Sequence, residues 1–171
     1  MVKRLLVFTF LCLAAFSIQA QGKTSASPAG TKATANPAIN RIDLITVAKE
    51  YLGTPYRRGS TNPKKGFDCS GFVYYIYKKF EVILPRSSRD YKSYGKALKP
   101  EEFEVGDVIV FYGFKDSKHI GHVGIICEAN GMKSKFIHAS SGKAHSVIIS
   151  DLDSDMYHRR FYKCIDVIGK R

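Results

Sequence analysis

The sequence predicts an α+β domain with helices in its first half and an antiparallel sheet in its second half. Residues 41–52 and 69–80 carry apolar side chains at the helical spacings of three and four. From residue 106 onward the pattern changes to short runs rich in Val, Ile, Phe and Tyr, separated by Gly, Asn and Asp. Helices that precede the strands, rather than alternate with them, are typical of helices packed on one face of an antiparallel sheet.

The individual elements follow from these patterns and from the residues that interrupt them. The first helix should stop at Gly53 and Pro55, and the second should begin near Cys69 after a long turn-forming stretch. A third, short helix is predicted over residues 87–94, with Ser87 or Ser88 as its cap. We expect about five or six strands, of which five can be placed: residues 107–112, 122–127, 135–139, 146–149 and 161–168.

The first twenty residues resemble a signal peptide that is removed on export. Lys3 and Arg4 form a basic head, residues 5–16 are mostly apolar, and Ala20 offers a small residue before the cut. The apolar run is too short to span a bilayer as a mature helix. We therefore expect an exported protein, in the periplasm or outside the cell, without stable membrane insertion; an uncleaved anchor is the alternative.

Residues 21–40 are rich in Ala, Thr, Ser, Pro and Lys and have no apolar period, so they are predicted to be a flexible linker. Residues 41–171 have the length of one domain with a single core, and we expect a monomer. Removal of Lys3 and Arg4 lowers the formal net charge from +12 to +10. Such a charge favours anionic envelope polymers as partners; the cations are scattered and no nucleic-acid motif is present, so we predict no nucleic-acid partner.

Cys69 is a candidate nucleophile because it lies where a helix should begin. Asp68 or Ser70 could cap that helix, which leaves the thiol close to unpaired backbone N–H groups and the positive end of the helix dipole. The alternative is a small buried apolar cysteine. Two other cysteines, Cys127 and Cys164, fall in predicted strands and are expected to be buried thiols, although a disulfide between them is an alternative.

A catalytic cysteine needs a base, and His122 and His138 are the candidates. His122 begins one predicted strand and His138 ends the next, so a hairpin would place them side by side. A second imidazole can fix the tautomer and orientation of the first. Satisfied core histidines and a metal site are the alternatives. A metal would need a third ligand at fitting spacing, and no Cys-x-x-Cys or His-x-x-x-His pattern occurs; we predict no metal and no cofactor.

Six motifs, in this order, resemble those of the NlpC/P60 cell-wall peptidases over about residues 42–168: Gly53-Thr54-Pro55-Tyr56, Asp68-Cys69-Ser70-Gly71-Phe72-Val73, Leu84-Pro85-Arg86-Ser87-Ser88, Val105-Gly106-Asp107-Val108-Ile109-Val110-Phe111, Gly121-His122-Val123-Gly124-Ile125 and Phe136-Ile137-His138-Ala139. The resemblance implies a circularly rearranged papain-like α+β fold, with residues 41–171 as the peptidase domain. It also implies hydrolysis of peptidoglycan stem peptides.

The same resemblance assigns roles to single residues. It implies that Cys69 is the nucleophile, His122 the base and His138 the group that orients the base. It places the hydroxyl of Tyr56 in the site, where this hydroxyl and the Cys69 N–H are candidate oxyanion donors. Asp68 and Ser70 match a pair that in some members holds a free amine of the stem peptide. We expect Cys69 and His122 to form a thiolate–imidazolium pair.

The leading hypothesis is an exported cysteine endopeptidase that acts on stem peptides or muropeptides, at the γ-D-glutamyl–diamino-acid bond. An amidase or acyltransferase of the same fold would share Cys69 and His122. A non-catalytic wall-binding or inhibitor protein is the alternative from a different class, and intact Cys69, His122 and His138 argue against it.

Overall fold

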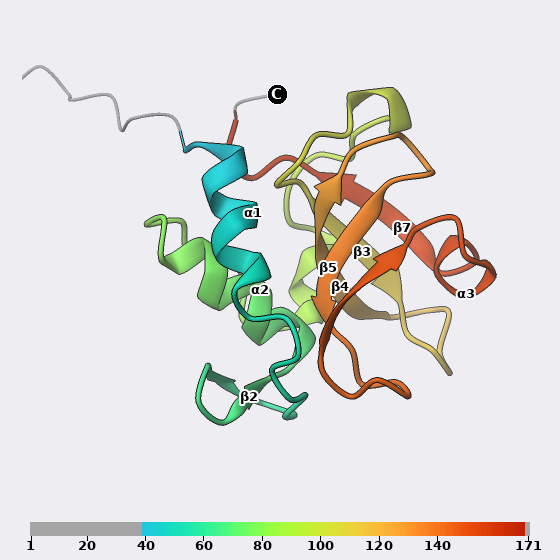
Figure 1. Ribbon diagram of the computed structural model, residues 1–171. Helices are drawn as coiled ribbons and strands as arrows, with labels where there is room; N and C mark the ends of the chain where they lie inside the picture. The colour runs from blue at the N-terminus through green and yellow to red at the C-terminus, as the bar shows by residue number, and fades with distance from the viewer. Residues whose placement is uncertain (1–38, 170–171) are drawn as a thin grey trace, which may run out of the picture. The chain divides into compact units, whose positions relative to one another are not determined.

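Two helices pack against one face of a five-stranded antiparallel sheet (Figure 1). The computed structural model of the chain describes residues 39–169, so the predicted signal peptide and almost all of the predicted linker lie outside the described residues. The helices are α1 (Arg41–Lys49), α2 (Cys69–Lys78) and α3 (Asp155–His158), with 3-10 helices η1 (Ser88–Lys92) and η2 (Pro100–Glu102). The strands are β1 (Thr61–Asn62), β2 (Gly66–Phe67), β3 (Val108–Tyr112), β4 (Ile120–Glu128), β5 (Lys135–Ala139), β6 (Val147–Asp151) and β7 (Phe161–Ile165).

The predicted order of helices and strands is confirmed, with differences at the element ends. The first helix ends at Lys49, because residues 50–53 form a turn in which Gly53 has a positive φ of 81°. The third predicted helix is the 3-10 helix η1. The short hairpin β1–β2, η2 and α3 were not predicted; each has two to four residues, too few to show a period.

The sheet has the strand order β6-β5-β4-β3-β7, so β4 is its central strand. All neighbouring strands are antiparallel. α2 contacts β4 and β5, and α1 packs on α2. The candidate base His122 therefore lies on the central strand, and His138 on the strand beside it.

Each face of the sheet contributes to a separate apolar cluster. The side chains of β3 and β4 alternate between them: Val108, Val110, Val123 and Ile125 face the helices, whereas Ile109, Phe111 and Ile126 face the opposite side. Four α2 side chains complete the larger cluster and are fully buried: Phe72, Val73, Ile76 and Tyr77. Burial of such a face stabilises a fold by about 25 cal/mol per Å² of apolar surface. None of the helices within residues 39–169 combines the length and the apolar character needed to cross a membrane.

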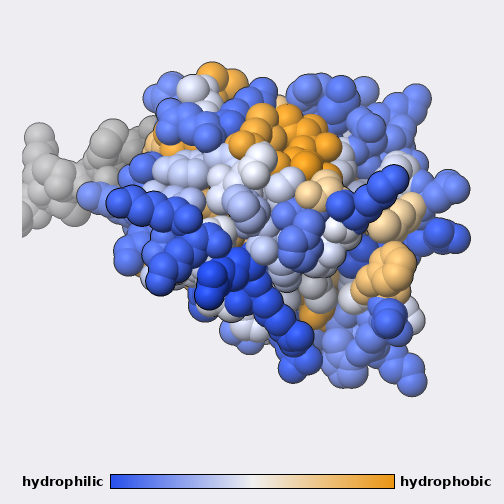
Figure 2. All heavy atoms as spheres, turned by 60° about the horizontal axis from the view of Figure 1, so that its bottom comes forward, coloured by the Kyte–Doolittle hydropathy of each residue, from blue (hydrophilic) through white to orange (hydrophobic). Residues whose placement is uncertain are grey.

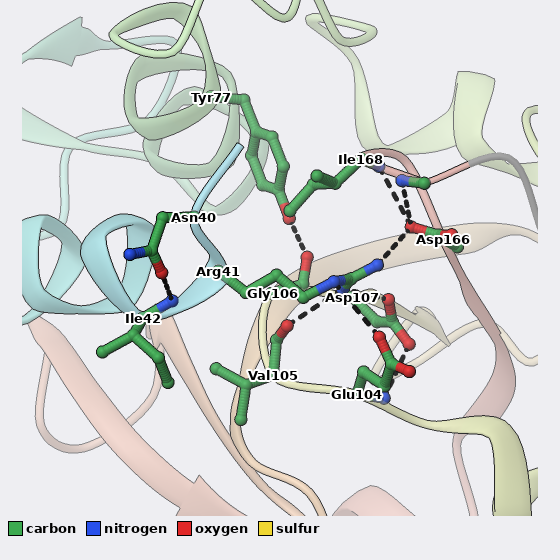
Figure 3. A network of polar contacts seen from close by, with 11 residues as sticks. Asn40, Arg41, Ile42, Tyr77, Glu104, Val105, Gly106, Asp107, Asp166 and Ile168 are labelled. Carbon is green, nitrogen blue, oxygen red and sulfur yellow. Dashed lines mark hydrogen bonds and ion pairs between the residues drawn. The ribbon is translucent and has the colours of Figure 1, made fainter. Parts of the chain in front are cut away.

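Arg41 connects the start of α1 with the loop before β3 and the segment after β7 (Figure 3). Its Nη1 lies 2.9 Å from Oδ1 of Asp107 and its Nη2 lies 2.7 Å from Oδ1 of Asp166. Both carboxylates are buried, with 0% and 1% of their side-chain surface exposed. Asn40 caps α1 by accepting hydrogen bonds from the N–H groups of Ile42 and Asp43, which holds Arg41 in the first turn.

We expect Arg41→Ala to lower the free energy of unfolding by about 3 kcal/mol, because removal of one partner leaves charge in a buried site without its counter-ion. Urea unfolding followed by circular dichroism measures the change. Arg57→Ala, at an exposed arginine, is the matched control and should change stability by less than about 0.5 kcal/mol. A similar small change in both variants would show that the Arg41 network contributes nothing to stability.

Candidate active site

Cys69 is the first residue of α2, as the sequence predicts, and Asp68 is the residue that caps the helix. An Oδ1 atom of Asp68 accepts a hydrogen bond from the N–H of Gly71 at 2.6 Å. Gly71 is required here, because a Cβ at this position would lie 2.1 Å from the carbonyl oxygen of Ser60. The close approach of the turn at Ser60 therefore fixes where α2 starts, and with it the position of the thiol.

Asp68 is also held by an arginine whose role sequence reasoning missed. Arg86 donates to both carboxylate oxygens of Asp68, at 2.9 and 2.8 Å, and its Nη1 also lies 3.2 Å from Oγ of Ser70. The N–H of Gly59 donates to the second oxygen at 2.7 Å. Arg86 belongs to the Leu84–Ser88 motif, but its distance in sequence from Asp68 does not predict a contact between the two side chains. The carboxylate is thus paired with a guanidinium in a bidentate geometry, among the stronger kinds of charge-assisted contact.

The thiol of Cys69 is buried, with 8% of the residue exposed. The backbone N–H groups of Ser70, Val123 and Cys69 itself lie near the sulfur and favour the thiolate, which lowers the pKa. Burial acts in the opposite direction and is the larger effect, with the neighbouring Asp68 charge adding to it, so the pKa of Cys69 rises to about 11. Because Val123 directly follows His122 on β4, its contact with the sulfur places the thiol next to the backbone of the candidate base.

His122 and His138 are brought together as the sequence predicts. Nε2 of His122 lies 2.9 Å from Nδ1 of His138, and the two rings are nearly perpendicular, at 89°. Gly124 makes room for this pair: a Cβ there would lie 2.7 Å from Cδ2 of Phe136 and 3.1 Å from Cβ of His138. Gly124 thus admits the side chains of the neighbouring strand β5, whereas Gly121 allows the close approach of the backbone at Gly113.

Two further residues, which sequence reasoning missed, contact the ring nitrogen of His138 that faces away from His122. Nε2 of His138 lies 3.0 Å from Oγ of Ser150 and 3.3 Å from the hydroxyl of Tyr157. If the nitrogen of His138 that faces them carries the proton, its Nδ1 accepts from Nε2–H of His122. That arrangement leaves Nδ1 of His122 as the nitrogen able to take a proton from a thiol. Ser150 and Tyr157 are therefore positioning residues for the tautomer of the base.

Burial keeps both histidines neutral near pH 7. It lowers the pKa of His122 well below its usual value, with smaller contributions from His138 and Arg160, and lowers the pKa of His138 to about 3. Together with the raised pKa of Cys69, this favours a neutral thiol and a neutral imidazole in the substrate-free protein. The result differs from the thiolate–imidazolium pair expected from sequence, because sequence shows the helix end and not the depth of burial.

Tyr56, Asp68, Cys69 and Ser70 line one pocket of about 890 Å³. Burial and the neighbouring Cys69 raise the pKa of Tyr56, so its phenol stays protonated and able to donate. His122 lines an adjoining pocket of about 480 Å³, which shares Gly121 and Ser141 with the first. Five of the six sequence-predicted residues therefore line two adjoining pockets, and the sixth, His138, lines neither and contacts His122 instead.

Two other predictions concern cysteines and metals. Cys127 and Cys164 are buried thiols that form no disulfide, and they lie in the two different apolar clusters on opposite faces of the sheet. Within residues 39–169, no three His, Cys, Asp or Glu side chains gather closely enough to hold a metal ion.

The chain is similar to known proteins over most of the described residues. The model of the NlpC/P60 family matches residues 53–166. Gamma-DL-glutamyl hydrolase of Bacillus subtilis is 34% identical over 124 residues, which cover 72% of this chain and 28% of that protein. The probable endopeptidase NlpC of Escherichia coli K12 is 36% identical over 135 residues, which cover 74% of this chain and 82% of that protein. An NlpC/P60 family protein from Bacillus cereus ATCC 10987 has a similar solved structure, with a TM-score of 0.67 at 30% identity, over 78% of this chain and 42% of that chain.

The matched region holds α2, the central strand β4 and the strand β5, and so all three residues of the candidate Cys69–His122–His138 set. The chain belongs to the NlpC/P60 family. It spans about three tenths of the length of the B. subtilis relative.

The neutral burial of His138 predicts a loss of stability in acid. The pKa of His138 is about 3 in the folded protein and near 6.5 in the unfolded chain. Between these two values the unfolded chain binds a proton that the folded protein does not, so the folded state loses stability as the pH falls. We therefore expect the free energy of unfolding to fall between pH 6.5 and pH 4, by up to about 1.4 kcal/mol per pH unit for each such histidine. His138→Gln should show a shallower fall in urea titrations, whereas His158→Gln, at an exposed position, should keep the wild-type slope. Identical slopes in all three proteins would contradict the neutral burial of His138.

Proposed function

We propose that this protein is an exported cysteine endopeptidase that hydrolyses amide bonds in peptidoglycan stem peptides, at the γ-D-glutamyl–diamino-acid bond. The observation that carries the proposal is the buried His122–His138 hydrogen bond at 2.9 Å, together with a cysteine at the start of a helix that lines the adjoining pocket. The names of the B. subtilis hydrolase and the E. coli endopeptidase support the substrate class. The apolar amino-terminal segment of the sequence supports export.

The chemistry begins with transfer of the Cys69 proton to Nδ1 of His122 while the sulfur attacks the amide carbonyl carbon. Charge forms only at this step, because burial favours the neutral pair at rest. The negative oxygen of the tetrahedral intermediate is stabilised by hydrogen-bond donors, for which the Cys69 N–H and the Tyr56 hydroxyl are the candidates. The first N–H groups of a helix have no partner within the helix, so the Cys69 N–H is available.

His122 then returns its proton to the leaving nitrogen, the C–N bond breaks, and a thioester to Cys69 remains. A water molecule gives its proton to His122 and attacks the thioester, which releases the acid and restores the thiol. His138, held by Ser150 and Tyr157, keeps Nδ1 of His122 directed at the reacting atoms through both steps. The reaction needs no group beyond the side chains described and water.

Asp68 and Ser70 are proposed to hold a free amine of the stem peptide. Arg86 already occupies both oxygens of Asp68, so an incoming ammonium must share that carboxylate with the guanidinium. Asp68 also caps α2. An amidase or acyltransferase that uses the same Cys69 and His122 is the second candidate function, and identification of the reaction product separates these activities.

We expect Cys69→Ala to abolish hydrolysis and to leave the fold intact, since one small side chain at a helix start contributes little packing. Cys127→Ala is the matched control: it should retain turnover and lose about 1–2 kcal/mol of stability through a small core cavity. The measurement is mass spectrometry of purified muropeptides after incubation with each protein, which identifies the cleaved bond as well. Hydrolysis by Cys69→Ala at the wild-type rate would exclude Cys69 as the nucleophile.

His122→Ala should reduce kcat as severely as the loss of Cys69, because nucleophile and base act as one unit. His138→Ala should cost less, about 10- to 100-fold in kcat, since water can partly replace an orienting partner. Steady-state rates on one purified muropeptide give both values, and circular dichroism confirms folding. If the two variants lose the same activity, His138 does more than orient the base.

A further inference from the structure

The pocket beside His122 has a composition that the proposed chemistry of Cys69 does not explain. Its volume is about 480 Å³, and Arg160 and Lys143 are its two cationic lining residues. Among the described residues, no Asp or Glu lines it. Its apolar part is formed by Phe114 and Met156, which are 73% and 39% exposed. A large exposed phenylalanine at the rim of a pocket is typical of a site that receives a ligand.

Arg160 forms a hydrogen bond within the protein through its Nε atom. Its Nε donates to the carbonyl oxygen of Tyr112 at 3.0 Å, and its guanidinium lies over the rings of Phe114 and Tyr157, at 5.6 and 6.0 Å from their centroids. Within residues 39–169, Arg160 forms no ion pair with a carboxylate. The residue is half-buried and fixed in orientation, so a carboxylate that reaches its terminal nitrogens would meet a preorganised donor.

The chemistry of the proposed function decides which part of the substrate enters this pocket. Cys69 lines the larger pocket, and the acyl group stays attached to its sulfur after the first step. His122 lines the smaller pocket and must give its proton to the departing nitrogen. The leaving amine therefore belongs on the side of Arg160, and the acyl part on the side of Tyr56 and Asp68. Gly121 and Ser141, which line both pockets, mark the boundary where the cleaved bond lies.

We propose that the pocket formed by His122, Phe114, Lys143, Met156, Tyr157 and Arg160 is the leaving-group site and that it selects an amine whose own carbon skeleton bears a carboxylate, bound by Arg160 with Lys143. The inference rests on the proposed function. An amino-acid or diamino-acid leaving group has this chemistry: the nitrogen that accepts the proton from His122 is separated from its carboxylate by one carbon atom or by a short chain. A bare or amidated amine lacks it.

The test uses the muropeptide that the wild-type chain is found to cleave, prepared in two forms. One form has the free carboxylate nearest the leaving nitrogen and the other has that group as a primary amide. We expect the wild type to show a kcat/KM about tenfold or more higher for the acid, the effect of one charge-assisted contact. In Arg160→Gln the ratio of acid to amide should fall toward one, and in Lys143→Gln it should fall by a smaller factor.

The ratio is measured on one enzyme at one pH, so any effect of Arg160 on the pKa of His122 acts on both substrates and cancels. Arg159→Gln, at the exposed neighbouring arginine that lines neither pocket, is the matched control and should keep the wild-type ratio. Lys143 is exposed in a loop, so its variant provides the test if Arg160→Gln fails to fold.

The outcomes separate the two proposals. Equal rates on acid and amide by the wild type, or a preference that persists in both Arg160→Gln and Lys143→Gln, would overturn the leaving-group site and leave the peptidase proposal standing. Failure of the wild type to cleave any muropeptide would overturn the proposed function, and the leaving-group assignment with it.

Discussion

The packing of α2 on the central strand β4 is the constraint on which the candidate site depends. Cys69 comes from the helix and His122 from the strand, so their relative position is set by the apolar side chains between these two elements. Those side chains are fully buried on α2, and Gly71 and Gly124 remove the side chains that would hold neighbouring segments apart. A close-packed interior of this kind holds positions to a fraction of an ångström, which is the precision that proton transfer between a thiol and an imidazole requires.

The same packing sets the charge state of the reacting groups. Burial raises the pKa of Cys69 and lowers the pKa of His122, and both changes disfavour the ion pair. For Cys69, the backbone N–H groups of Ser70, Val123 and Cys69 itself lower the pKa, but by less than burial raises it. Burial therefore favours a neutral thiol and a neutral imidazole before substrate binds, and in the proposed reaction the thiolate forms as the sulfur attacks. A buried neutral thiol of this kind is also less exposed to oxidation than a free thiolate would be.

The elements that sequence reasoning could find are those with a local signal. Asp68 before an apolar helical period predicts the position of Cys69, and short apolar runs predict the five strands of the sheet. The contacts made by Arg86 and Arg160 could not be found in this way, because each depends on segments far apart in the chain with no periodic relation between them. The burial of His122 and His138 results from the packing of the sheet, so the sequence pattern could not predict the shifts in their pKa values.

Several arginines of this basic chain have identifiable positions in the fold. Arg41 is paired with the buried carboxylates of Asp107 and Asp166 and connects three segments of the fold (Figure 3). Arg86 is paired with Asp68 at the larger pocket. Other cations lie at the two pockets, with Arg58 and Arg89 at the larger and Arg160 at the smaller. Figure 2 shows hydrophilic side chains over much of the face that it presents, with apolar groups in separate patches. Among the described residues, five cations thus line the two pockets, counting Arg86 and Lys143, whereas most of the other lysines and arginines lie elsewhere. A cationic pocket lining favours anionic ligands.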